Sequence, residues 1–214
     1  MLEREREEVV EFARRMVSDG LVVGTSGNVS VRAGDLVAVT PSGTDYGSMT
    51  VSDVVVVDLA GEVVAGSLRP TSELPLHLVA YREHGAGAVV HTHSPAATAL
   101  SLLREELPPV HYQIAMFGGS VLVAPYATFG TEELRDNASR SLEGRSAVIL
   151  KHHGTLTTGG DLRGAYDRAR QLEWLCDVYL RAAAVAEPVA LPADEIERVV
   201  AEFADYGQPP TARG

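Results

Sequence analysis

Two closely spaced histidines in this sequence occur where a divalent metal ion could be bound. His91 and His93 lie in the segment GAVVHTHS, whose apolar start and polar end predict a buried strand that finishes at the histidines. Because side chains alternate in direction along a strand, both imidazoles project from one face. A His-x-His pair alone is a modest signal, since two histidines in a loop are more often structural. The pair marks this strand end as a candidate metal site.

A third imidazole and a carboxylate could complete such a site. His153 follows the run AVILK at its polar end and precedes Gly154, so it lies at a second strand tip that could meet the first. Catalytic zinc sites commonly use three protein ligands and keep a position for water or substrate. We select Glu73 as a fourth ligand or a base. An acidic residue in the first turn of a helix often only complements the helix dipole, and the spacing leaves both interpretations open.

The other histidines are not predicted to bind metal. His152 is adjacent to His153 and points the opposite way if the strand continues, so we expect it to be structural or to support the ligands. His77 and His84 lie on a predicted helix and are expected to be packed or exposed to solvent. His111 follows two prolines, where packing is the ordinary role.

Hydrophobic periodicity predicts the elements that must position these residues. Ser72 is expected to cap a helix that has Pro75 in its first turn and ends at Gly85. Short β-branched runs separated by turn residues predict an antiparallel meander with strands at 29–32, 36–40 and 54–58. Apolar residues at helical spacing predict further helices at 2–19, 132–142, about 161–186 and 193–207.

The composition indicates an ordinary globular protein, which we expect to form one domain spanning residues 1–214. A net charge of -11 without a cluster of basic residues argues against nucleic acid and anionic membranes as partners. A small phosphate ester stays possible, because backbone amides and hydroxyls at a helix start can bind one. One cysteine, Cys176, excludes an intramolecular disulfide, and no apolar run approaches the ~20 residues of a membrane span. We expect a cytoplasmic location.

Seven motifs in a fixed order make the chain similar to a known family. They are GTSGNVSVR at 24–32, TPSG at 40–43, PTSE at 70–73, VVHTHS at 89–94, PPVHYQIAMFGG at 108–119, APYATFGT at 124–131 and KHHG at 151–154. Over nearly its whole length the chain resembles the L-fuculose-1-phosphate aldolase group of class II aldolases, which is related to ribulose-5-phosphate epimerases and adducin heads. The resemblance implies an α/β fold, a three-layer α/β/α sandwich with a mostly antiparallel mixed central sheet. It also implies a homotetramer with active sites between subunits.

The same resemblance implies roles for individual residues. One Zn²⁺ per subunit would be bound by Glu73, His91, His93 and His153. Glu73 would leave the metal to act as the base, and Tyr112 would be the proton donor, reaching in from a neighbouring chain. Phe203 and Tyr206 resemble a C-terminal segment that closes over the site. The substrate phosphate would be bound by residues of types that any turn contains: Thr25, Gly27, Asn28, Ser42, Gly43, Thr71 and Ser72.

The resemblance implies reversible retro-aldol cleavage of a ketose 1-phosphate to dihydroxyacetone phosphate and an aldehyde. Proton transfer beside a carbonyl needs an electrophile at oxygen and a base at carbon, and Zn²⁺ with a carboxylate supplies both. L-fuculose-1-phosphate and a 5-deoxypentulose-1-phosphate both satisfy the motifs. Residues 74–77 and 116–121 differ most from fuculose aldolases, so the identity of the aldehyde stays open.

Four other activities or roles stay open from the sequence. A pentulose-phosphate 4-epimerase generally carries aspartate where this chain has Glu73, which favours the aldolase. A methylthioribulose-1-phosphate dehydratase shares the fold and the histidine pair. A Schiff-base aldolase would have to use Lys151, the one lysine of the chain. An adducin-like binding module would be expected to have lost the histidines that this chain keeps.

Overall fold

The computed structural model describes residues 1–205, and the helices and strands are taken from it. The helices are α1 Glu3–Ser18, α2 Leu74–Glu83, α3 Pro95–Ser101, α4 Glu132–Leu142, α5 Leu162–Ala183 and α6 Ala193–Asp205, with 3₁₀ turns η1 Val51–Asp53 and η2 Tyr112–Phe117. The strands are β1 Asn28–Ala33, β2 Leu36–Val39, β3 Val55–Asp58, β4 Val63–Ala65, β5 Ala88–Thr92, β6 Glu106–Leu107, β7 Val121–Ala124, β8 Ala147–Leu150 and β9 Gly154–Gly159. Tyr206, predicted to belong to a closing segment, lies outside the described residues.

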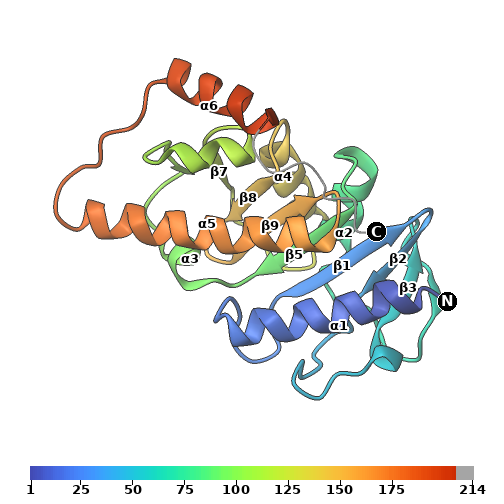
Figure 1. Cartoon of the computed structure of the whole chain (residues 1–214). Helices are drawn as coiled ribbons and strands as arrows, with labels where there is room; N and C mark the ends of the chain where they lie inside the picture. The colour runs from blue at the N-terminus through green and yellow to red at the C-terminus, as the bar shows by residue number, and fades with distance from the viewer. Residues whose placement is uncertain (206–214) are drawn as a thin grey trace, which may run out of the picture.

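Within residues 1–205 the nine strands form one sheet in the order β4-β3-β2-β1-β5-β9-β8-β7-β6 (Figure 1). Neighbouring strands are antiparallel except β7 and β8, which run parallel. Helices cover both faces of this sheet. The predicted fold class, a three-layer α/β/α sandwich with a mostly antiparallel mixed sheet, is confirmed.

Alternating side chains of the strands pack on the two faces of the sheet. On one face Val29 and Val90 pack with α1 and the start of α5. On the other face Val37 and Val89 pack with α2 and α4. This alternation follows from the two-residue period of a strand, and it requires helices on both sides because both sets are apolar. None of the described helices is both long and apolar enough to cross a membrane.

Three central strands bring distant parts of the sequence to one edge of the sheet. Asn28, the first residue of β1, lies opposite His91 of β5. Thr92 at the end of β5 lies opposite Thr155 near the start of β9, and His153 directly precedes β9. The register of β1, β5 and β9 therefore places the predicted ligands at the same edge.

The predicted helix after the PTSE motif exists, but its predicted cap is wrong. Glu73 is the N-cap residue, and no side chain caps the helix. The turn before the helix is held instead by Thr71, whose hydroxyl accepts a hydrogen bond from the Glu73 amide at 3.2 Å and whose carbonyl accepts one from Leu74 at 3.2 Å. Ser72 does not cap the helix and is exposed beside the site.

Gly154 stands where β9 passes closest to the end of β5. A methyl group at this position would lie 2.0 Å from the carbonyl oxygen of Thr92 and 3.2 Å from the Cα of His93. Only a glycine lets the two strand ends approach this closely, and the approach brings His153 beside the His-x-His pair.

We predict that Gly154→Ala destabilises the fold by about 1–3 kcal/mol, because β5 and β9 must separate, and that it also weakens metal binding. Thermal unfolding and the metal content of the purified protein measure both effects. Gly160→Ala is the matched control, since a methyl group there meets nothing within 4 Å. Equal stability and equal metal content in the two variants would show that the close approach is unimportant.

Candidate metal centre

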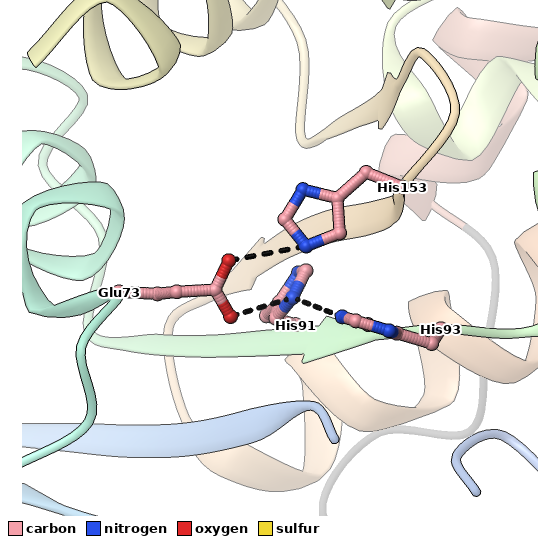
Figure 2. A group of neighbouring side chains, drawn as sticks. All are labelled: Glu73, His91, His93 and His153. Carbon is pink, nitrogen blue, oxygen red and sulfur yellow. Dashed lines mark hydrogen bonds and ion pairs between the residues drawn. The ribbon is translucent and has the colours of Figure 1, made fainter. Parts of the chain in front are cut away.

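Glu73, His91, His93 and His153 form one cluster at the sheet edge (Figure 2). One potential ligand atom from each residue lies within 4.8 Å of the others. The three imidazole centroids are 4.7 to 4.9 Å apart. The cluster joins the N-terminus of α2, the end of β5 and the turn between β8 and β9. The structure thus brings together the four residues selected from the sequence.

The hydrogen bonding of His91 leaves its Nε2 atom facing other lone pairs. Its Nδ1 lies 2.9 Å from the carbonyl oxygen of Thr155, and since a carbonyl only accepts, Nδ1 carries the hydrogen. Nε2 of the neutral ring then has a lone pair, 3.0 Å from Nε2 of His93 and 3.0 Å from Oε2 of Glu73. Acceptors that face one another repel unless a proton or a cation lies between them. A divalent cation would suit this arrangement.

The second carboxylate oxygen of Glu73 supports the same interpretation. Oε1 lies 3.1 Å from Nε2 of His153, within ion-pair distance. It is nevertheless a buried oxygen with no correctly oriented hydrogen bond from any described residue. Three imidazole nitrogens with one carboxylate are ligands typical of Zn²⁺ and of similar divalent metals. The residues present therefore fit a metal site.

Burial and mutual charge set the protonation of the cluster. Burial alone would raise the pKa of Glu73, but the charge of His91 and the close approach of the His153 ring lower it well below its usual range. Burial opposes protonation of His91, yet without a metal between them the adjacent Glu73 raises its pKa, so that a proton can take the place of the cation. Burial, followed by the charges of His91 and His153, lowers the pKa of His93 to about 3. At neutral pH Glu73 is therefore ionised and His93 neutral, and both offer lone pairs.

A cavity of about 300 Å³ opens beside the cluster. Glu73, His93 and His153 lie in its wall, whereas His91 is fully buried. Among the described residues, no lysine or arginine lines it. An anion in this cavity would have to be bound by amides and hydroxyls. All seven residues predicted to bind phosphate line the same cavity: Thr25, Gly27, Asn28, Ser42, Gly43, Thr71 and Ser72.

The first of these turns is built directly on the metal-site strand. Gly27 has a φ of 72°, and a methyl group there would lie 2.5 Å from Val22 Cγ1 and 2.8 Å from the His91 carbonyl oxygen. Tyr46 donates a hydrogen bond from its hydroxyl to the Gly27 carbonyl at 2.6 Å. Burial raises the pKa of Tyr46 to about 12, so this hydroxyl keeps its hydrogen. The turn and the ligand strand therefore hold each other in place.

Sequence reasoning missed the aromatic side of the cavity. Tyr126 and Phe129, both strongly exposed, line it together with His152. His152 was expected to point away from His153 if the strand continued. The strand does not continue, because β8 ends at Leu150 and His152 adopts a left-handed turn conformation with a φ of 57°. Its ring meets that of Tyr126 edge to face at 6.0 Å. The two aromatic residues in the motif APYATFGT could have indicated this side of the cavity from the sequence.

Three residues with predicted or alternative roles lie outside the cavity wall of this chain. Tyr112 is 49% exposed at the start of η2, and its ring stacks on Phe203 of α6 at 6.3 Å. Lys151 forms an ion pair with Glu105. Within residues 1–205, Tyr112, Phe203 and Lys151 are all absent from the residues that line the cavity. A role for Tyr112 in the site thus depends on a second subunit.

The other histidines agree with their predicted packing. His77 is fully buried on α2. His84 shares a 2.8 Å hydrogen bond with the Ser139 hydroxyl. His111 packs its ring against Tyr112 and Trp174.

Known proteins match this chain over most of its length. Residues 7–180 match the family described as Class II Aldolase and Adducin N-terminal domain. The chain is 42% identical to a 5-deoxy-D-ribulose 1-phosphate aldolase of Bacillus thuringiensis serovar kurstaki, over 97% of this chain and 99% of the relative. It is 43% identical to a 5-methylthioribulose-1-phosphate/5-deoxyribulose-1-phosphate aldolase of Rhodospirillum rubrum, over 94% of this chain and 92% of the relative. The solved structure of an L-fuculose 1-phosphate aldolase superposes with a TM-score of 0.91 at 40% identity, and the match covers 94% of this chain and 96% of that one.

We predict that removal of the metal with a chelator lowers the melting temperature. A ligand at about 100 times its Kd stabilises a protein by about 2.7 kcal/mol, which corresponds to roughly 5–10 °C for a chain of this size. Differential scanning calorimetry with and without added Zn²⁺ measures the shift. The variant His93→Ala should lose the shift, whereas the control His84→Ala, away from the cluster, should keep it. A shift that survives in His93→Ala would place the metal elsewhere.

Proposed function

Because the chain belongs to the class II aldolase and adducin N-terminal domain family, we propose that it reversibly cleaves a ketose 1-phosphate to dihydroxyacetone phosphate and an aldehyde, using one Zn²⁺ per subunit. The observation that carries this proposal is the convergence of three imidazoles and a buried carboxylate beside a cavity, with Glu73, His93 and His153 in its wall. Turns rich in glycine and hydroxyl groups form another wall. Such a cavity can hold a phosphorylated sugar against a metal.

The phosphate end of the substrate would lie against the glycine, serine and threonine turns. Thr71 and Ser72 lie just before Glu73, the N-cap residue of α2, so a phosphate beside them would also face the positive end of that helix dipole. Hydroxyl groups and backbone amides can then bind the dianion although the chain as a whole is acidic. With the phosphate placed there, the carbonyl end of the sugar would point toward the histidines.

Glu73, His91, His93 and His153 would hold the metal. When bound, Zn²⁺ would polarise the ketose carbonyl and stabilise the enediolate that cleavage produces. His91 is held ready by its hydrogen bond to Thr155. In the cleavage direction the C3–C4 bond breaks, and Glu73, after it has left the metal and taken up a proton from solvent, gives that proton to the carbon to complete dihydroxyacetone phosphate. In the reverse direction Glu73 removes that proton.

The proton on the aldehyde side would be handled by Tyr112 of the partner subunit. In cleavage the C4 hydroxyl must lose a proton as the aldehyde forms, and in synthesis the proton must return. Tyr112 is half exposed on its own subunit and lies away from the cavity there, which supports a role across a subunit contact. A homotetramer with shared sites would satisfy this requirement.

The aldehyde would lie near Tyr126, Ala127 and Phe129. This largely apolar lining favours an aldehyde whose far end is a methyl or methylthio group. The named activities of the relatives concern 5-deoxyribulose 1-phosphate, 5-methylthioribulose 1-phosphate and L-fuculose phosphate. We therefore propose that the substrate is one of these three or a close analogue.

We predict that a coupled assay detects dihydroxyacetone phosphate from at least one of these three ketose phosphates, and that a chelator abolishes it. Glu73→Gln should lower kcat by about 10²- to 10⁴-fold, because it removes the base. Glu62→Gln, an exposed change in the turn before β4, is the control and should leave kcat unchanged. An epimeric or dehydrated product would replace the proposal with the epimerase or the dehydratase. Chelator-resistant turnover trapped on Lys151 by borohydride would indicate a Schiff-base enzyme.

We predict that Glu73→Gln and Tyr112→Phe complement each other in mixed oligomers. Each variant alone should be strongly impaired, but random mixing at equal amounts after dissociation and reassembly should restore about a quarter of the sites. Regained activity is measured against a mixture that was never dissociated. If no activity returns while mixed oligomers are present by native mass spectrometry, Glu73 and Tyr112 do not serve one site from different subunits.

A further inference from the structure

A continuous row of buried hydrogen bonds extends from Glu73 into the protein, away from the cavity. Nδ2 of Asn28 donates to Oε2 of Glu73 at 3.0 Å. Oδ1 of the same amide lies 2.5 Å from Nε2 of His77, and Nδ1 of His77 lies 2.6 Å from the Ser30 hydroxyl. The Ser30 hydroxyl is 2.5 Å from the hydroxyl of Tyr81. All five residues are buried, and each is at most 6% exposed.

The carboxylate at one end dictates the direction of every hydrogen bond in this row. An ionised carboxylate only accepts, so Asn28 must turn its NH₂ group toward Glu73 and its carbonyl toward His77. His77 must then carry its hydrogen on Nε2 and accept on Nδ1. The Ser30 hydroxyl donates to Nδ1, which leaves it to accept from Tyr81. With these assignments each of the four contacts has one donor and one acceptor.

The protonation states of the buried groups agree with this assignment. Burial lowers the pKa of His77 to about 3, so its ring is neutral and has one donor and one acceptor nitrogen. Burial raises the pKa of Tyr81, so its hydroxyl keeps the hydrogen that it donates.

From this row of contacts we infer that His77, Ser30 and Tyr81 are positioning residues, which act on the base Glu73 through the amide of Asn28. The inference rests on the proposed function, because it assigns a consequence to the base. If His77 could not donate, the Asn28 carbonyl would be buried without a partner, and the reversed orientation of the amide would become populated because only the contact with Glu73 would oppose it. Its carbonyl oxygen would then face the carboxylate, and two acceptors would repel. Glu73 would move from the geometry in which it transfers a proton.

The row reaches the base and not the rest of the cavity wall. Ser30, His77 and Tyr81 do not line the cavity, in contrast to Asn28 and Glu73. Apart from Asn28, the six other residues proposed to bind the phosphate do not belong to the row and stay in place when it is interrupted. Loss of the row should therefore lower kcat more than it raises KM.

The kinetic test compares His77→Leu, His77→Gln and Tyr81→Phe with wild type. His77→Leu should lower kcat, and also the rate of solvent-deuterium exchange into dihydroxyacetone phosphate, by about 10²-fold with KM changed far less. His77→Gln should recover most of this loss, because its amide can donate to Asn28 from the position of Nε2. Tyr81→Phe should cause a smaller kcat loss. The control Tyr166→Phe also removes a buried hydroxyl, one that donates to Asp19, and should keep kcat unchanged.

A second readout is independent of turnover. In nitrogen-15 NMR spectra of the folded wild-type protein, with or without metal, His77 should be the neutral tautomer that carries hydrogen on Nε2, and that hydrogen should exchange slowly. An Nδ1–H tautomer would overturn the inference. The inference would also be overturned if Tyr81→Phe and His77→Leu both kept the kcat of wild type. The same holds if His77→Leu, His77→Gln and Tyr166→Phe all lost kcat to an equal extent. If wild type formed no dihydroxyacetone phosphate, the proposed function would fail, whereas the tautomer would still report on the row.

Discussion

The mutual repulsion of four electron-rich side chains is the constraint on which the rest of this structure depends. The Nε2 atoms of His91 and His93 lie 3.0 Å apart, and Glu73 approaches His91 equally closely. Neutral imidazoles and a carboxylate brought this close are stable only with positive charge between them. Protons can supply that charge in the metal-free protein, and a divalent cation can supply it with the geometry that a class II aldolase needs.

The sheet edge serves as a common support for the metal centre and the substrate pocket. Gly27 lets the first turn of the pocket rest on the backbone of His91, and Gly154 lets β9 rest on Thr92. Both contacts are to carbonyl oxygens of β5, the strand that carries the His-x-His pair. A substrate bound to the turn would therefore be fixed relative to the metal by backbone packing, which is stiffer than a contact between long side chains. Such stiffness is what proton transfer over short distances requires.

Much of the fold was predictable from local patterns, and the contacts between distant segments were not. Residues 132–142 form the predicted helix because a capping threonine and helical periodicity agree there. The strand that carries His91, Ala88–Thr92, was predictable from its apolar run. The N-cap at Glu73 was missed because Thr71 holds the preceding turn. The link from His77 through Asn28 to Glu73 joins residues 49 and 45 positions apart, and no local pattern specifies such pairing.

Anomalous diffraction at the zinc absorption edge, from crystals of the protein grown with Zn²⁺, tests the central claim most directly. We predict a single strong peak per chain, about 2.0–2.2 Å from Nε2 of His91, His93 and His153 and from a carboxylate oxygen of Glu73. A peak bound by other residues, or density showing the three rings too far apart to share an ion, would contradict the account.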